Sequence, residues 1–171
     1  FRNYIAKKAG LKNILTDSVN IYGTVEFGAM AHETALTNLI RRLALNNQEV
    51  FQSLFKDAHR LPTLAQYYPH QIYFEEVNGE VIATGYGSAI PLIRYRFPDK
   101  GGVVEFREMF KKFNQFNVDL WEEIKKNKIS KNIMKLPFVY VYERSDMAAS
   151  LVGILIYPEY IKSALQHKKL S

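Results

Sequence analysis

The sequence lacks several features, and each absence excludes a class of protein or site. There is no cysteine, so disulfides and thiolate metal sites are excluded, as in a protein of a reducing compartment. No apolar stretch approaches the roughly 20 residues that span a bilayer, and the start at Phe1 lacks the charged-then-apolar order of a signal peptide. We find no internal repeat and no low-complexity linker. We therefore expect a cytoplasmic location and no membrane partner.

An initiator methionine is also missing, and we expect an internal segment of a longer protein whose remaining chain is its structural partner. The 171 residues correspond to about one domain. With 47% hydrophobic and 13% aromatic residues, the chain has enough apolar mass to bury a core.

The formal net charge of +6 raises the question of a nucleic-acid partner. The densest basic runs are 125–128 and 166–169, both at the ends of expected helices, where cations interact favourably with the helix dipole. Neither run is interleaved with aromatic residues that could stack on bases. We interpret them as solvated helix ends and expect no nucleic-acid partner; salt-sensitive binding to DNA or RNA would contradict this.

Helical spacing of apolar residues predicts a short helix over 1–9, stopped by Gly10. It predicts a longer helix over 29–56, either continuous or divided at Asn46-Asn47, and a third helical region over 106–124, with a possible interruption at 114–117. We expect the aromatic stripe of the third region to pack in the core rather than to bind a cofactor.

Strand patterns fill much of the remaining sequence. Segments 71–77 and 80–84 flank Asn78-Gly79, a dipeptide suited to a type I′ hairpin turn. A second strand pair is predicted over 91–97 and 103–105, joined by a turn at 98–102. Two further strands are expected over 136–142 and 153–157, before a terminal helix that begins at Pro158. The order of elements predicts an α+β fold.

Three segments each join a strand to a tight turn with polar residues at its tip, where scaffolds tend to place functional groups. In the first, 20–28, a short strand ends in Tyr22, followed by Gly23, Thr24 and Glu26. Together an aromatic ring, a permissive backbone, a hydroxyl and a carboxylate can surround a nucleotide and its metal. The alternative is a strand that turns into a helix, capped by Thr24 and with Glu26 in its first turn.

The second segment comprises the hairpin 78–84 and the strand 91–99. Asp99, just past the expected strand end, can accept two hydrogen bonds from ribose hydroxyls, or it can simply stabilise its own turn. Arg94 and Arg96 lie on one face by period two, so we expect them to share an acidic partner.

The third segment runs from 143 to 161. Arg144 follows a strand end and can reach a nucleotide, and Asp146 stands where the chain changes direction. The alternative is that Arg144 and Asp146 simply belong to an exposed turn.

In order and spacing, the three segments resemble the core motifs of the adenylate-forming superfamily, in particular phenylacetate-coenzyme A ligase and its capsule-biosynthesis-type relatives. That family has an aromatic-Gly-x-Thr-Glu motif, a Gly-Glu-Leu/Val-x-x-Thr hairpin, and a Pro-Leu-Ile-Arg-Tyr-Arg-Thr-Gly-Asp strand. Its last motif here is Gly-Arg-x-Asp-Asp, leading to a Pro-x-Glu-Ile helix start. Six consecutive residues, 91–96, agree with the third motif. The resemblance covers most of the chain, and 30–70 and 107–135 look like variable helical insertions.

The resemblance implies an ATP-dependent ligase that activates a carboxylic acid as its adenylate and transfers the acyl group to coenzyme A, with Mg²⁺ as the metal and ATP/AMP as the nucleotide. It implies that Tyr22 packs on adenine, that Glu26 binds Mg²⁺ and that Asp99 holds the ribose hydroxyls. The implied nucleotide-binding set is Tyr22, Gly23, Thr24, Asp99 and Arg144.

The resemblance also assigns the C-terminal part. Asp146 falls at the hinge of the small C-terminal domain, and Gly153 matches the glycine that the pantetheine arm of coenzyme A approaches. Residues 1–143 would be the C-terminal portion of the large nucleotide-binding domain, and 144–171 the hinge and the start of the small domain. We expect a partial adenylate-forming fold in which antiparallel hairpins form a barrel-like sheet flanked by helices.

The chain departs from the family pattern at several positions. Its hydroxyl is Thr24, one place early, with Val25 before the glutamate; Phe97-Pro98 replaces Thr-Gly; and Glu143 and Met147 replace a glycine and an aspartate. The phosphate loop would lie before Phe1 and the catalytic lysine after Ser171, so we expect the segment alone to be inactive and to contain no catalytic residue. The alternative from another class is a non-catalytic nucleotide-binding or assembly module.

Overall fold

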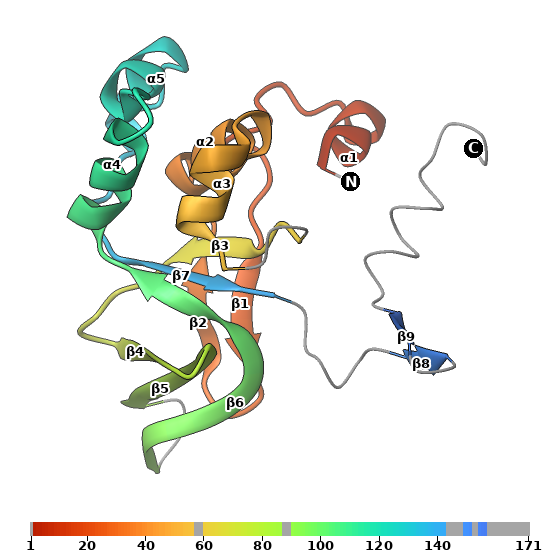
Figure 1. Ribbon diagram of the computed structural model, residues 1–171, viewed down its shortest axis with the longest axis vertical. Helices are drawn as coiled ribbons and strands as arrows, with labels where there is room; N and C mark the ends of the chain where they lie inside the picture. Colours follow the sequence, from red (N-terminus) through yellow and green to blue (C-terminus); the bar gives the residue numbers. More distant parts are fainter. Residues whose placement is uncertain (1, 57–59, 87–89, 143–148, 152–153, 157–171) are drawn as a thin grey trace.

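A computed structural model of the chain describes residues 2–56, 60–86, 90–142, 149–151 and 154–156. Its main feature is an antiparallel sheet of seven strands in the order β1-β2-β3-β7-β6-β5-β4 (Figure 1). The strands are β1 (Ile21–Thr24), β2 (Gly28–His32), β3 (Thr63–Gln66), β4 (Ile72–Val77), β5 (Glu80–Tyr86), β6 (Pro91–Val104) and β7 (Phe138–Val141). A separate hairpin pairs β8 (Ala149–Leu151) with β9 (Ile154–Ile156).

The described residues also form five α-helices and one 3₁₀ turn, so the fold is α+β as predicted. The helical elements are α1 (Arg2–Ala9), α2 (Ala35–Asn46), α3 (Gln48–Leu54), α4 (Phe106–Asn114), α5 (Leu120–Lys126) and η1 (Ser130–Asn132). Within the described ranges, no helix is both long enough and apolar enough to cross a bilayer.

The β4–β5 hairpin is confirmed. Six register pairs join the two strands, and the turn residues Asn78 and Gly79 have φ angles of 54° and 79°, as a type I′ turn requires. Strand β9 lies within the predicted 153–157. The expected helix from Pro158 and the expected domain boundary at 143/144 fall outside the described residues.

The predicted helix over 29–56 is wrong at its start. Strand β2 occupies Gly28–His32 because these residues pair with β1, and the helix begins only after Thr34, whose side chain and that of Thr37 form a reciprocal capping box. The alternative of two helices is confirmed. Asn47 ends α2 and caps α3, accepting hydrogen bonds from the backbone amides of Glu49 and Val50.

The predicted turn at 98–102 is also wrong, because β6 runs unbroken through it. Pro98 is tolerated since it falls at a register irregularity between the pairs Ile82↔Arg96 and Glu80↔Lys100. Beyond it the strand leaves β5 and pairs with β7. Gly101 is required there, because a Cβ atom would overlap the carbonyl oxygen of Tyr140.

One hydrophobic core lies between the helices and the β3–β7 part of the sheet (Figure 1). The predicted aromatic stripe packs here, with Phe106 partly buried and these other members buried: Met109, Phe110, Phe113, Leu120 and Ile124. Trp121 is the exception, with 43% of its surface exposed. The core role of this stripe is otherwise confirmed.

A second core fills the inner side of the bend that β6 makes (Figure 1). Tyr22 of β1 stacks against Phe74 of β4 at a centroid distance of 6.0 Å, although these strands are the two edges of the sheet. The barrel-like expectation is nevertheless wrong: the sheet is open, and no ladder among the described strands joins β1 to β4. Side chains such as Tyr22 occupy the space inside the bend, between the β1–β2 hairpin and the β4–β5–β6 part of the sheet, and we call this space the seam.

Candidate functional site

The candidate site is an open pocket of ≈ 610 Å³ on the seam. The β1–β2 turn forms one wall and β6 forms the other, with these lining residues: Gly23, Thr24, Val25, Glu26, Tyr95, Arg96, Phe97, Pro98 and Asp99. The volume is within the range of about 300–1,000 Å³ usual for small-molecule sites. Two of the three segments singled out in the sequence therefore line the same pocket.

Tyr22 and Asp99, 77 residues apart, are joined by a hydrogen bond in which the Tyr22 hydroxyl donates to Oδ2 of Asp99 at 2.7 Å. Asp99 is buried, with 8% of its surface exposed. Burial, then the negative charge of Asp99 and this hydrogen bond, raise the pKa of Tyr22. Tyr22 thus stays a neutral donor at physiological pH, and Asp99 keeps acceptor capacity for a second ligand.

Gly23 and Thr24 set the shape of the turn. A Cβ atom at Gly23 would overlap the carbonyl oxygen of Gly28, so only glycine fits in this close backbone approach. The Thr24 hydroxyl accepts a hydrogen bond from the Phe27 amide at 3.3 Å. The alternative in which Thr24 caps a helix is wrong, since the chain turns directly back into β2.

Glu26 lies in the turn, exposed, and faces β6. Its Oε1 atom accepts a hydrogen bond from the Tyr95 hydroxyl at 3.1 Å. This bond raises the pKa of Tyr95. No group of three or more His, Cys, Asp or Glu side chains suited to a metal is found among the described residues. A single carboxylate fits Mg²⁺ that is held mainly by nucleotide phosphates and water.

The basic side chains beside Asp99 are fixed by Glu80. Arg96 and Lys100 both pair with its carboxylate, the latter at 2.8 Å, and these two hydrogen bonds lower the pKa of Glu80 to about 2. Arg94 instead pairs with Glu75 at 3.0 Å. The expectation that Arg94 and Arg96 share an acidic partner is therefore wrong. Arg94 has a φ of 51° next to a register irregularity, which breaks the period-two alternation.

Asp99 does not stabilise a turn, since it lies within the continuous strand β6. The other predicted site residues, Arg144, Asp146 and Gly153, lie outside the described residues, so their placement stays a prediction.

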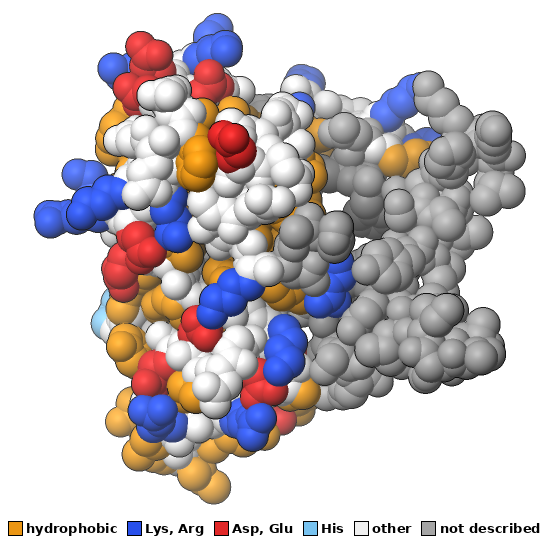
Figure 2. All heavy atoms as spheres, viewed as in Figure 1, with side chains coloured by type: hydrophobic (Ala, Val, Ile, Leu, Met, Phe, Trp, Pro, Cys, Tyr) orange, Lys and Arg blue, Asp and Glu red, His pale blue; other side chains and the backbone are white. Residues whose placement is uncertain are grey.

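Charge on the face shown in Figure 2 is mixed, with Lys and Arg side chains interspersed among Asp and Glu. The run 125–128 coincides with the end of α5, as predicted, and Lys126 pairs with Glu123 at 3.3 Å.

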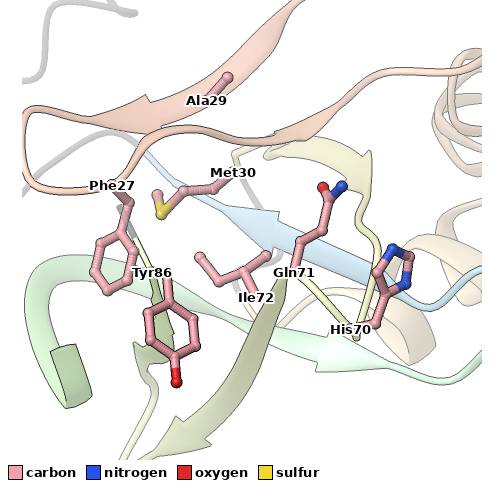
Figure 3. A pocket seen from close by; sticks show the side chains of 7 residues that line it. All are labelled: Phe27, Ala29, Met30, His70, Gln71, Ile72 and Tyr86. Atoms are coloured by element: carbon pink, nitrogen blue, oxygen red, sulfur yellow. The ribbon is translucent and has the colours of Figure 1, made fainter. Parts of the chain in front are cut away.

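A smaller pocket of ≈ 280 Å³ lies on the same seam, between β2 and the β4–β5 hairpin (Figure 3). Phe27, Met30, Ile72 and Tyr86 gather on one side of it, and Gln71 and His70 lie on the other. The Phe27 ring also makes edge contacts with Tyr95 and Phe97 of the larger pocket. Phe27 therefore lies between the two pockets.

The sequence indicated neither the smaller pocket nor a role for Tyr95. The alternation of 93, 95 and 97 did place Tyr95 on the same face as the buried Phe97, and that pattern was the one available indication. The smaller pocket depends on residues from three separated segments, whose meeting follows only from the bend of the sheet.

No family model, no curated protein and no solved structure matches this chain. The functional argument therefore depends on the motifs in the sequence and on the geometry of the seam.

Proposed function

We propose that the chain is part of a cytoplasmic, ATP-dependent ligase that activates a carboxylic acid as its adenylate and passes the acyl group to coenzyme A. The single observation that supports this most is the convergence of Gly23, Thr24, Glu26 and Asp99 on one pocket. The resemblance assigned these residues to one nucleotide site, although Asp99 is more than 70 positions away from the others in the sequence.

In this proposal the larger pocket binds ATP. Asp99, oriented by Tyr22, accepts hydrogen bonds from the ribose hydroxyls with its remaining lone pairs. Glu26, at the open rim, binds the Mg²⁺ that neutralises the phosphates. The chain's own contribution to catalysis is positioning and charge neutralisation while the acid attacks the α-phosphate and pyrophosphate leaves.

Tyr22 has a different position from the one that the resemblance suggests. One face of its ring is covered by Phe74, and its hydroxyl is engaged by Asp99. Tyr22 is not among the residues that line the pocket, so in the proposed site its task is to hold Asp99 rather than to pack on adenine.

The smaller pocket is suited to the apolar part of the acid. Its walls are apolar and aromatic on one side, and the polar Gln71 and His70 are placed to bind a polar group on the other. The proposed substrate class is a small organic acid with one apolar or aromatic group.

The test is acid-dependent exchange between ATP and pyrophosphate, measured in the full-length protein with a panel of small acids. We expect Glu26→Ala and Asp99→Asn each to lower the exchange rate about 100-fold, the usual effect of removing one charge-stabilising group. Asp99→Asn keeps an acceptor for Tyr22 and so preserves the fold. Glu122→Ala, an exposed carboxylate on α5, is the matched control and should exchange at the wild-type rate.

Two results would contradict the ligase. Undiminished exchange in both variants would exclude the pocket as the nucleotide site. No exchange with any acid, with ATP still bound, would support the alternative of a non-catalytic nucleotide-binding module, in which the Tyr22–Asp99 bond serves binding alone.

A further inference from the structure

We propose that Tyr95 is a positioning residue that holds the Glu26 carboxylate in place for a magnesium–nucleotide complex. This inference rests on the proposed function, because it assigns a magnesium role to Glu26. It concerns a residue to which neither the motifs nor their spacing gives a task.

The two side chains differ in how firmly they are fixed. Glu26 is exposed and lies in the tight turn between β1 and β2. Tyr95 lies on β6, where it pairs with Ala83 of the neighbouring strand β5. Its ring contacts Phe27 and Phe97 edge-on, at centroid distances of 6.0 Å and 5.4 Å. Tyr95 is therefore the rigid partner.

The hydrogen bond of 3.1 Å joins the Tyr95 hydroxyl to one carboxylate oxygen, Oε1. A carboxylate has about four acceptor positions, so the bond orients the group and leaves capacity for a cation. An exposed glutamate loses side-chain entropy when it binds a metal, and the Tyr95 hydrogen bond removes part of that loss in advance.

Both residues line the larger pocket, from opposite walls of the seam. The bond therefore also connects the β1–β2 turn to β6. A purely structural bond between these walls would affect stability and nucleotide binding in general. A positioning bond affects the step that uses Mg²⁺, and this difference separates the two roles.

The experiment is calorimetric titration of the full-length protein with ATP, in EDTA and at a series of MgCl₂ concentrations. In Tyr95→Phe we expect the Mg²⁺ concentration for half-maximal enhancement of ATP binding to rise about tenfold, the usual effect of losing a hydrogen bond to a charged group. The affinity for ATP in EDTA should be unchanged. Tyr73→Phe, at an exposed tyrosine of β4 outside the pocket, is the control. It should match the wild type both in its Mg²⁺ requirement and in its ATP affinity in EDTA.

A double-mutant cycle sharpens the result. Glu26→Gln should raise the Mg²⁺ requirement by itself, and adding Tyr95→Phe should then have no further effect, since both changes act on the same carboxylate. Additive effects would overturn the inference. So would a Tyr95→Phe variant that loses ATP affinity equally with and without Mg²⁺, or one that behaves as wild type.

The wild-type titration separates this inference from the proposed function. If the wild type binds no ATP under any condition, the proposed nucleotide site is wrong, and the role of Tyr95 is wrong with it. If the wild type binds magnesium–ATP and Tyr95→Phe does not differ from it, only the role of Tyr95 is wrong.

Discussion

The Tyr22–Asp99 hydrogen bond has consequences for both site and stability. It joins the edge strand β1 to the middle of β6, and it gives the buried carboxylate of Asp99 a neutral hydrogen-bond donor, the Tyr22 hydroxyl. Without that donor the carboxylate would be desolvated and less fully bonded, which is costly. The bond therefore stabilises the same geometry that the proposed ribose contact requires.

Alkaline unfolding should report on this bond. Because burial and Asp99 raise the pKa of Tyr22, the folded state binds its proton more tightly than the unfolded state. The stabilisation that this proton provides is complete at pH values below the unfolded-state pKa of about 10. At higher pH the stabilisation falls by about 1.4 kcal/mol per pH unit. We predict that Tyr22→Phe reduces the alkaline slope of the unfolding free energy by about one proton and costs about 2 kcal/mol at pH 7.

The measurement is urea unfolding between pH 7 and pH 11.5. Tyr67 and Tyr140 retain part of the slope in the variant, since burial raises the pKa of each. Tyr86→Phe, with Tyr86 82% exposed, should leave the slope as it is. Parallel pH curves for wild type and Tyr22→Phe would contradict the prediction.

At the residue scale, the sequence predicts which side chains share the site better than it predicts their partners. Gly23, Thr24, Glu26 and Asp99, which the resemblance assigns to one site, line one pocket, whereas Tyr22 of the same set does not line it. The Tyr22–Asp99 and Tyr95–Glu26 bonds could not be predicted, because they depend on how far the sheet bends. The ion pairs of Arg94 and Arg96 could not be predicted either, since a positive φ at Arg94 changes the alternation.

At the scale of elements, local chemistry predicts boundaries where one or two residues by themselves set a hairpin turn or a helix end. Asn78-Gly79 and Asn47 are such cases, and both elements match. Prediction of an element fails where pairing with a strand distant in the sequence determines its conformation. Residues 28–32 have apolar spacing compatible with a helix, but β1 draws them into the sheet. Pro98 and the following glycines suggest a turn. In β6, however, Pro98 lies at a register irregularity and the glycines allow a close approach to Tyr140.

Asn47 offers a test at this scale, because one residue ends α2 and begins α3. Its side-chain oxygen accepts from the amides of Glu49 at 3.1 Å and Val50 at 3.2 Å. We predict that Asn47→Ala lowers the unfolding free energy by about 1 kcal/mol, the usual effect of removing an N-cap. Chemical denaturation followed by circular dichroism measures this.

Two matched variants isolate the cap. Asn47→Asp retains an acceptor and should be close to the wild type, and Asn46→Ala, at the exposed last residue of α2, should change stability by less than about 0.5 kcal/mol. Equal losses in Asn46→Ala and Asn47→Ala would show that the Asn47 cap is not the cause, since alanine has the higher helix propensity and the exposed Asn46 makes no capping bond.

At the scale of the whole molecule, side-chain contacts across the seam hold the sheet in its bent form. Among the described strands, the β1–β2 hairpin joins the rest of the sheet through a single register pair, His32↔Gln66, whereas six pairs join β4 to β5. Across the seam the hairpin is held by side chains: the Tyr22–Asp99 and Glu26–Tyr95 bonds and the Phe27 ring. The hairpin is therefore the part of the sheet with the fewest backbone ties, and it carries one wall of the proposed nucleotide pocket.

We predict that the β1–β2 hairpin opens as a unit at a lower free energy than global unfolding. Native-state hydrogen exchange should show the β1–β2 amides exchanging at least about tenfold faster than those of β4–β5. Removing both cross-seam bonds in Tyr22→Phe/Tyr95→Phe should accelerate hairpin exchange by a further factor of about 10–100 and leave β4–β5 almost unchanged. Uniform acceleration of all strands would mean that the hairpin does not open separately. Because a ligand in the larger pocket contacts both of its walls, magnesium–ATP should slow hydrogen exchange selectively in the β1–β2 hairpin. The same measurement therefore tests whether the hairpin forms part of the proposed nucleotide site.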